Sequence, residues 1–368
     1  MKQLKASIYL VILALLDKEV VMGHNTTSTL KLLHVLFRHG NRNPEYDSIW
    51  EGNPYTDESF YPEGFAQLTN AGKETAYQMG LFLRQSYGEF LGETWNINTL
   101  DVRTTDYNRT KMSAMLMLAG LYPPKCEDNW SGEEGFPWQP IPYNYWPLEN
   151  DTLLNSLLIL ESPTFCKEFL ALLNSTEIST YLSGKYGAAM AILNRYTGIP
   201  FTDYRVALKY ADTMKIQTEL GYKLPDWCSQ VYPKPLTDLT SDFYYIYTNT
   251  TVLRRQFAGQ LVNKILQDSD SVANGSLSPS TRKMFVYSAH DFNVGTMVLS
   301  LDAYQMSRPP PYGSIVIFEV HEIDEVYGLQ LYYQDYSTRK PHALNIPGCN
   351  HFCPLTKFRS LVQDILPV

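Results

Sequence analysis

The sequence lacks the motifs of several common enzyme classes. It contains no HExxH, no GxSxG and no P-loop, which removes the usual zinc proteases, serine hydrolases and nucleotide kinases. Its cysteines form no CxxC pair and accompany no histidine pair at zinc spacing, so neither a metal site nor a cofactor is expected. No run of lysine and arginine stands out and the net charge is −8, so no nucleic-acid partner is expected. Any anion site must therefore be built by a few converging arginines.

The N-terminus has the pattern of a secretory signal peptide. The residues MKQLKASIYLVILALL place two lysines before an apolar stretch, Ile8 to Leu16, that is too short to span a bilayer. We expect residues 1–23 to form this signal; the alternative is a buried N-terminal helix. No later stretch reaches membrane-spanning length. The sequence therefore predicts a secreted, extracellular protein without a stable membrane anchor, in preference to one in the lysosomal lumen.

Glycosylation sites and cysteines also fit secretion. The Asn-x-Ser/Thr sites are Asn25, Asn108, Asn150, Asn174, Asn249 and Asn274. The five cysteines are Cys126, Cys166, Cys228, Cys349 and Cys353. We expect a disulfide between Cys349 and Cys353, because the short PGCNHFCP loop keeps them close. One of the other three should stay free or bond between chains, and a homodimer is compatible with the sequence.

Composition and element order predict an α/β protein with a helical insertion. With 368 residues, 44% of them hydrophobic and 18% charged, the chain is long enough for a sizeable core. Buried-strand patterns separated by helices predict a mainly parallel sheet, extended by a hairpin of Ser314–Val320 and Tyr327–Tyr333. Residues 24–125 and 240–368 should form the core. Residues 126–239, with helical patterns and no clear intervening strands, should form a mostly helical cap.

Charged residues follow three of the predicted strands. These strands are the apolar run that begins at Leu30, the segment Ile97–Val102 and the segment Lys283–Tyr287. Since ligands bind beyond the carboxyl ends of strands in α/β sheets, groups far apart in sequence can converge there. The candidate site residues are Arg38, His39, Arg42, Arg103, His290 and Asp291.

Three arginines around a histidine suit a phosphoryl group. The guanidinium fork matches phosphate oxygens, and unbound arginines would repel one another. A histidine can attack phosphorus to give a phosphohistidine that water later hydrolyses, a role that fits His39. His290 would donate to the phosphate oxygens, and a protonated Asp291 would give its proton to the leaving alcohol. That proton predicts an acidic working pH.

At these residues the chain resembles the histidine acid phosphatase family. The motifs, in family order, are RHGNRNP from Arg38, RTTD from Arg103 with Arg109-Thr110 and Met112-Ser113-Ala114, YSAHD from Tyr287, and the Pro347-Gly348-Cys349 and Cys353-Pro354-Leu355 loop. The type it resembles most is prostatic and lysosomal, and among these the secreted insect venom acid phosphatases. The resemblance implies a three-layer α/β sandwich, like that of phosphoglycerate mutases, with a smaller helical domain inserted.

The resemblance also implies residue roles and substrates. His39 would be the phosphorylated nucleophile and Asp291 the proton donor, while Arg38, Arg42, Arg103 and His290 would bind phosphate. The implied substrates are small phosphate monoesters or phosphoproteins.

Two departures from the family pattern leave alternatives open. Phe292 and Asn293 follow the His-Asp pair where many relatives carry small hydroxyl residues, and Asn41 replaces an acidic residue. One alternative is a phytase or inositol-polyphosphate phosphatase, which would want more basic residues in the cap. The other is a secreted phosphate-binding or venom protein whose catalysis has weakened.

Overall fold

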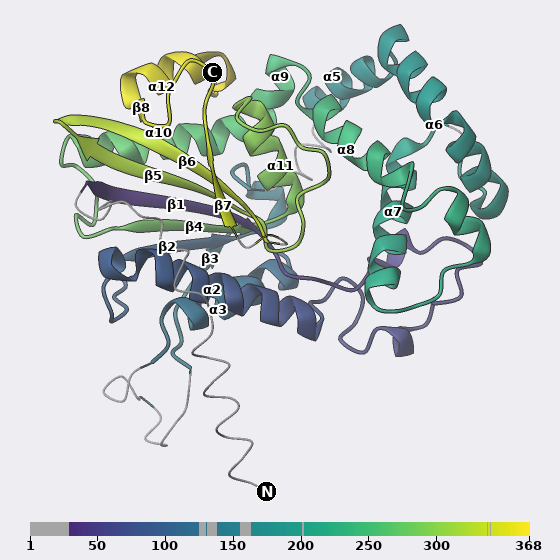
Figure 1. The fold of residues 1–368 in the computed structure, drawn as a ribbon, viewed down its shortest axis with the longest axis horizontal. Coiled ribbons are helices and arrows are strands. Elements are labelled where there is room, and N and C mark those ends of the chain that lie inside the picture. The colour runs from purple at the N-terminus through teal and green to yellow at the C-terminus, as the bar shows by residue number, and fades with distance from the viewer. Residues whose placement is uncertain are drawn as a thin grey trace, which may run out of the picture.

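The computed structural model describes residues 29–124, 130, 138–154, 163–200, 202–336, 338 and 340–368. The predicted signal peptide, the glycosylation site at Asn25 and Cys126 lie outside these residues, as does the side chain of Cys166. The described chain forms one eight-stranded sheet with helices on both faces and a helical lobe at one end (Figure 1). The predicted α/β class with a helical region is confirmed.

The sheet is parallel in one half and antiparallel in the other. Its strand order is β3-β2-β4-β1-β5-β6-β7, with β8 beside β6. The parallel strands are β1 (Leu30–Arg38), β2 (Leu100–Thr104), β3 (Asn144–Tyr145) and β4 (Met284–Ala289). The antiparallel strands are β5 (Ile315–Ile323), β6 (Val326–Asp335), β7 (Lys340–Leu344) and β8 (Cys353–Pro354).

Strand β1 lies at the centre of the sheet because its side chains are buried on both faces. Eight of its nine residues are buried, and it pairs with β4 in parallel and with β5 in antiparallel register. The predicted hairpin is confirmed, since β5 and β6 pair from Ile315 with Gln334 to Ile323 with Val326. The carboxyl ends of β1 and β4 therefore lie side by side.

Two helical layers cover the sheet, as Figure 1 shows. On one face lie α2 (Asn70–Leu91), whose N-cap residue is Thr69, and α3 (Asn108–Leu121). These two helices approach closely at Gly80, where a Cβ atom would lie 2.0 Å from the carbonyl oxygen of Met117. On the other face lie α10 (Gln260–Ala273), α11 (Asp291–Ser300) and α12 (Leu355–Val362).

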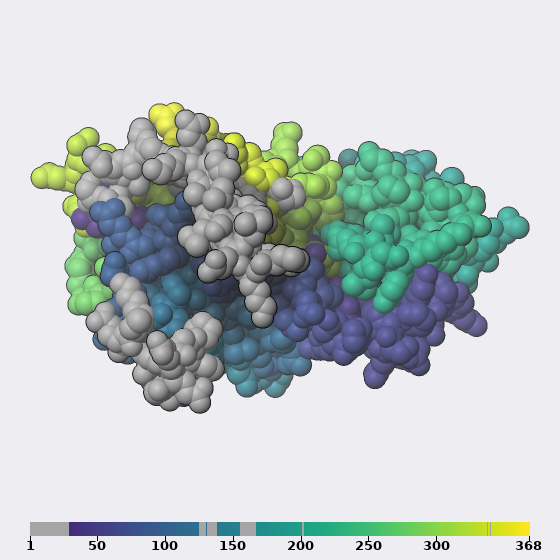
Figure 2. All heavy atoms as spheres, turned by 60° about the horizontal axis from the view of Figure 1, so that its bottom comes forward, coloured from purple at the N-terminus to yellow at the C-terminus, as the bar shows by residue number. Residues whose placement is uncertain are grey.

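The helical lobe has its own hydrophobic core. Its helices are α5 (Pro163–Leu173), α6 (Thr176–Thr197), α7 (Tyr204–Glu219) and α8 (Leu236–Tyr247). Trp50, from the loop after β1, packs against Tyr210 and Trp227 in this core. Figure 2 shows that loop region beneath the helices of the lobe. We call α5–α8 the cap; its exact boundaries, predicted at 126 and 239, stay a prediction.

Shorter elements connect these layers. Helix α9 (Thr251–Arg254) continues through a π-helical turn, Arg255–Gly259, into α10, which accounts for the apolar repeat from Leu253 to Ile265. The 3-10 turns are Tyr46–Ser48, Glu58–Phe60, Leu148–Asn150, Asp226–Gln230 and Gln363–Ile365.

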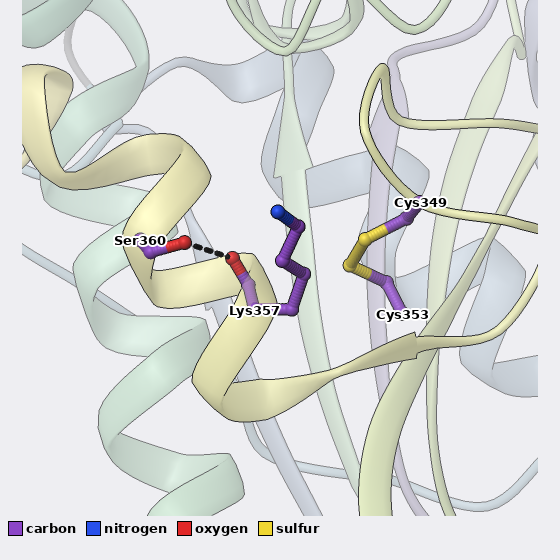
Figure 3. The surroundings of a disulfide bond; sticks show 4 residues. All are labelled: Cys349, Cys353, Lys357 and Ser360. Carbon is purple, nitrogen blue, oxygen red and sulfur yellow. Dashed lines mark hydrogen bonds between the residues drawn. A yellow bond between two sulfur atoms is a disulfide. The ribbon is translucent and has the colours of Figure 1, made fainter.

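The expected disulfide between Cys349 and Cys353 is present (Figure 3). It ties the loop before β8 to the start of that strand, where Cys353 pairs with Leu329 of β6. Lys357 and Ser360, in the following helix α12, lie nearby and are joined by a hydrogen bond from the Ser360 hydroxyl to the Lys357 carbonyl oxygen. Cys228 is a free, buried cysteine in the core of the cap.

Candidate active site

The candidate site lies where the carboxyl ends of β1 and β4 meet the first turns of α3 and α11. His39 directly follows β1, and His290 directly follows β4 and caps the N-terminus of α11. Their ring centroids are 5.5 Å apart although 251 residues separate them in the sequence. The parallel pairing of β1 with β4 causes this convergence, because it aligns Arg38 with Ala289.

His39 is held as a neutral imidazole. Its Nδ1 lies 2.8 Å from the carbonyl oxygen of Gly40, which accepts only, so Nδ1 carries the proton and the lone pair is on Nε2. Burial lowers the pKa of His39 well below its usual value, and the charges of Arg109, Arg38 and Arg42 lower it further. The ring therefore keeps a free lone pair in acidic solution.

Arg38 and Arg42 flank His39 in the sequence and in space. Arg38 is 2% exposed, donates to the Pro310 carbonyl oxygen over 2.7 Å and lies 3.1 Å from Asp291. Arg42 donates to Asp212 of α7 over 2.8 Å. Burial acts to lower the pKa of each guanidinium, but the carboxylates outweigh it and raise the pKa. Both arginines stay charged at any working pH.

The third arginine of the cluster is Arg109, for which the sequence analysis predicted no role. It lies in the first turn of α3, is 7% exposed, and contacts Glu45 over 3.2 Å. Burial and the charge of Arg42 lower its pKa to about 10, although Glu45 opposes them. Of the neighbouring positive charges, Arg109 has the largest lowering effect on the pKa of His39 and on that of His290. The Arg109-Thr110 pair belongs to one of the family motifs, but Arg109 lies inside a helix and not directly after a strand, so the search for charged residues at strand ends did not select it.

The structure does not place Arg103 with these arginines. Strand β2 runs to Thr104, past the predicted end at Val102, so Arg103 is a strand residue and not the first loop residue. Its guanidinium contacts Asp151 over 2.5 Å, and this carboxylate is fully buried and also accepts hydrogen bonds from the amides of Leu153 and Leu154. Arg103 is therefore committed to a structural ion pair.

His290 is positioned by Thr105, which the sequence analysis also missed. The Thr105 hydroxyl lies 2.9 Å from Nε2 of His290 and 2.9 Å from the Thr110 hydroxyl. Burial, followed by the charge of Arg109, lowers the pKa of His290 well below its usual value. The amide of His290 donates to the side chain of Asn293, which completes a capping box for α11. The unusual Asn293 thus has a structural role.

Asp291 is held as an ionised carboxylate by the neighbouring arginines. Burial acts to raise its pKa, but the charges of Arg38 and Arg42 outweigh burial and lower it below the usual value. This differs from the expectation of a protonated Asp291. A bound phosphate that neutralised the two arginines would raise the pKa of this carboxyl again.

The site has spare donors for an anion. The buried Nε groups of Arg38, Arg42 and Arg109 have no hydrogen-bond partner among the described residues. Their carboxylate partners, Asp291, Asp212 and Glu45, have side chains exposed by 31%, 29% and 35%. An oxyanion can therefore compete for these guanidinium groups from the solvent side.

A cavity of about 780 Å³ opens from the site between the sheet and the cap. Phe292 lines it and packs against Tyr244 and Tyr247 with ring centroids 5.6 and 4.5 Å apart. Further aromatic lining comes from Tyr232, Phe243, Tyr312 and Tyr336. The walls thus offer an apolar, aromatic surface next to a cationic floor.

Neither a cluster of metal ligands nor a helix that could span a membrane occurs among the described residues. Among these residues, no group of three or more His, Cys, Asp or Glu side chains is arranged as metal ligands. In the same part of the chain, none of the helices is both long and apolar enough to traverse a bilayer.

Solved structures with the same fold include bacterial phytases. The phytase of Klebsiella sp. ASR1 superposes with a TM-score of 0.68 at 16% identity, over 92% of this chain and 96% of that one. The Hafnia alvei phytase in complex with myo-inositol hexakis sulphate gives 0.66 at 17% identity, over 92% and 97%. At such low identity these similarities establish the fold alone.

Sequence relatives are more specific. The chain is 32% identical to venom acid phosphatase Acph-1 of Apis mellifera over 340 residues, and 33% identical to prostatic acid phosphatase of Homo sapiens over 343 residues. Both matches span 92% of this chain and 86% of the relative. The profile of the histidine phosphatase superfamily (branch 2) matches residues 29–334. The chain therefore belongs to branch 2 of the histidine phosphatase superfamily, and within it to the acid phosphatases.

Proposed function

We propose that this protein hydrolyses phosphate monoesters at acidic pH through a phosphohistidine on His39. The observation that carries the proposal is the site itself: a neutral histidine whose Nδ1 is fixed by Gly40, surrounded by three buried arginines with spare Nε donors. Phosphoryl transfer needs mainly positioning and charge stabilisation, and this arrangement supplies both.

The reaction divides among the residues by geometry. Nε2 of His39 attacks phosphorus while Arg38, Arg42 and Arg109 hold the equatorial oxygens, and the alcohol leaves. Arg109 replaces Arg103 in this proposal, because Arg103 is bound to the buried Asp151. His290, held by Thr105, is the further group that faces the phosphate.

Asp291 acts as proton donor with a proton that arrives with the substrate. Phosphate monoesters have a second pKa near 6, so the monoanion dominates in acid. When this anion neutralises Arg38 and Arg42, the pKa of Asp291 rises and its carboxylate can take up the proton and pass it to the leaving oxygen. Water then attacks the phosphohistidine, the Asp291 carboxylate takes the proton of this water, and the P–N bond breaks so that its electron pair returns to Nε2 of His39.

The test is release of phosphate from phenyl phosphate across pH 3–8, with and without EDTA. We expect activity on the acidic side that EDTA leaves unchanged, and loss of turnover in His39→Ala. Activity that disappears in chelator contradicts the metal-independent mechanism, and an active His39→Ala contradicts the nucleophile. Binding of phosphate without turnover supports the weakened-catalysis alternative.

Asp291→Asn tests the proton donor. Its rate should fall more on phenyl phosphate, whose leaving group needs a proton, than on para-nitrophenyl phosphate, whose leaving group needs little help. Equal losses on the two substrates contradict the role. A parallel assay on phytate tests the phytase alternative, since the aromatic walls and the carboxylates of Glu45, Asp212 and Glu219 disfavour a highly charged inositol phosphate.

We also infer that the protein is secreted. The signal-peptide pattern of residues 1–23 supports this, and relatives include a venom and a prostatic enzyme, although a lysosomal acid phosphatase of Homo sapiens is 31% identical as well. N-terminal sequencing of the protein recovered from culture medium checks it. The homodimer stays a prediction that light scattering tests.

A further inference from the structure

Lys215 is a cation in the cavity that the proposed reaction leaves unused. It extends from α7 of the cap and lines the same cavity as Arg38 and Asp291. Its Nζ lies 4.7 Å from the centroid of the Tyr312 ring, and the guanidinium carbon of Arg38 lies 4.0 Å from the same centroid. Arg38 and Lys215 thus lie beside the same aromatic ring and line the same cavity, so a substrate held at Arg38 lies near Lys215.

The pairing of Lys215 is loose compared with the other cations of the cavity. Its carboxylate partner is Glu219, 3.8 Å away, and the two side chains are 36% and 40% exposed. Arg38 and Arg42, in contrast, contact carboxylates at 3.1 and 2.8 Å. The ammonium can therefore exchange Glu219 for a ligand at small cost.

Lys215 keeps its positive charge among the groups that face it. Burial and the charge of Arg38 lower its pKa, while Glu219, Asp212 and Asp291 act in the opposite direction. Asp212 pairs with Arg42 and Asp291 pairs with Arg38, whereas the carboxylate that pairs with Lys215 is the loosely held Glu219. Lys215 remains protonated in acid, since its ordinary pKa is far above the working range.

We propose that Lys215 forms a second anion subsite, which selects phosphate monoesters whose alcohol portion carries another negative group about one aromatic ring from the phosphate. The class includes aryl phosphates with a carboxylate or a second phosphate at the far end. This inference rests on the proposed phosphatase function and adds a preference among its substrates. The aromatic walls hold the ring, and Lys215 binds its distal charge.

The first experiment measures binding without turnover. Calorimetry compares benzylphosphonate with para-carboxybenzylphosphonate, whose C–P bonds resist hydrolysis. The wild-type protein should bind the carboxylated ligand about tenfold more tightly, and Lys215→Met should lose this preference while its affinity for benzylphosphonate is retained. Lys215→Arg should keep the preference.

Lys209→Gln is the matched control. Lys209 lies on the same helix and lines the same cavity, but it pairs with Asp47. This variant should retain the preference. Equal binding of both ligands by the wild-type protein overturns the subsite. Equal weakening of both ligands in Lys215→Met also overturns it, because that pattern indicates that Lys215 merely supports Tyr312.

Kinetics then separates the subsite from the proposed function. The kcat/KM ratio of para-carboxyphenyl phosphate to phenyl phosphate should fall about tenfold in Lys215→Met. If the protein discriminates between the two phosphonates but hydrolyses neither ester, the phosphatase function is contradicted and the subsite is still supported. A third ester, 1,4-phenylene bisphosphate, shows whether a distal phosphate binds better than a distal carboxylate. If Lys215→Met lowers the kcat/KM of the esters with a distal anion, the result supports the subsite. If their kcat/KM is unchanged in this variant, the subsite is overturned.

Discussion

Arg103 at the end of β2 and Arg109 in the first turn of α3 lie six residues apart in the sequence, and each contacts a carboxylate. Only Arg109 belongs to the candidate site. Arg103 faces Asp151, which is fully buried and also binds two backbone amides. Arg109 faces Glu45, whose side chain is 35% exposed. Within the described part of the chain neither arginine has a partner for its Nε, so a spare donor does not distinguish them. The exposure of the carboxylate partner does.

This comparison teaches what makes an arginine available to a ligand. A phosphate can displace a carboxylate that returns to water, since that carboxylate regains its hydration. It cannot displace one that is buried, because the carboxylate would be left as an unpaired charge in the protein interior. Four variants test this distinction.

The largest effect is expected for Arg109→Gln. Removing one donor that stabilises the charge of a transition state typically costs about 10²–10³ in rate, so kcat/KM on phenyl phosphate should fall by about that factor. Stability should change little, because Glu45 stays partly exposed. Steady-state kinetics and urea unfolding measure the two effects. A variant with near wild-type kcat/KM removes Arg109 from the phosphate clamp.

Arg103→Gln should give the opposite pattern. It leaves the buried Asp151 without its cation, which we expect to lower the free energy of unfolding by about 3 kcal/mol. The kcat/KM of the folded fraction should remain close to that of the wild-type protein. Urea denaturation gives the stability, and assays below the melting temperature give the rate. A large loss of kcat/KM in a stable variant reinstates Arg103 as a phosphate ligand.

Thr105→Val should have an intermediate effect. Thr105 follows β2 directly and its hydroxyl holds Nε2 of His290. Loss of this hydrogen bond should lower kcat/KM about tenfold by releasing the ring. It should also alter the pH profile, whereas a purely structural loss lowers the rate equally at every pH. Thr105→Ser, which restores the hydroxyl, should recover the rate.

The smallest effect is a shift in the acid limb of the pH profile. Only neutral His39 can attack, and nearby arginines lower its pKa, with Arg109 the largest of these charges. Removing this cation raises the pKa of His39, so Arg109→Gln should lose its residual kcat/KM at a higher pH than the wild-type protein. Arg103→Gln should leave the limb in place. An equal shift of the acid limb in both variants contradicts the distinction between Arg103 and Arg109.

Much of the fold followed from local patterns. The apolar run of β1 and the alternation in β5 and β6 predicted a buried strand and a hairpin, both confirmed. The convergence of His39 and His290 followed from parallel pairing, because the carboxyl ends of parallel strands share one edge. Cys349 and Cys353 were close enough in sequence for their disulfide to be predicted.

The choice between Arg103 and Arg109 could not be made from the sequence. Both arginines come after Val102, where the sequence predicted the end of the strand. The extension of β2 by two residues to Thr104 depends on pairing with β4, a strand about 180 residues away. The commitment of Arg103 depends on Asp151, which lies 48 residues further on.

The amino-acid sequence by itself predicted strands β1, β2, β4, β5 and β6, the histidine pair and the family, because these depend on local periodicity and on motifs with fixed spacing. The tertiary structure alone decided which arginines face a ligand and where Lys215 lies. Those features depend on the burial of partners from distant segments, and burial is a property of the packed chain.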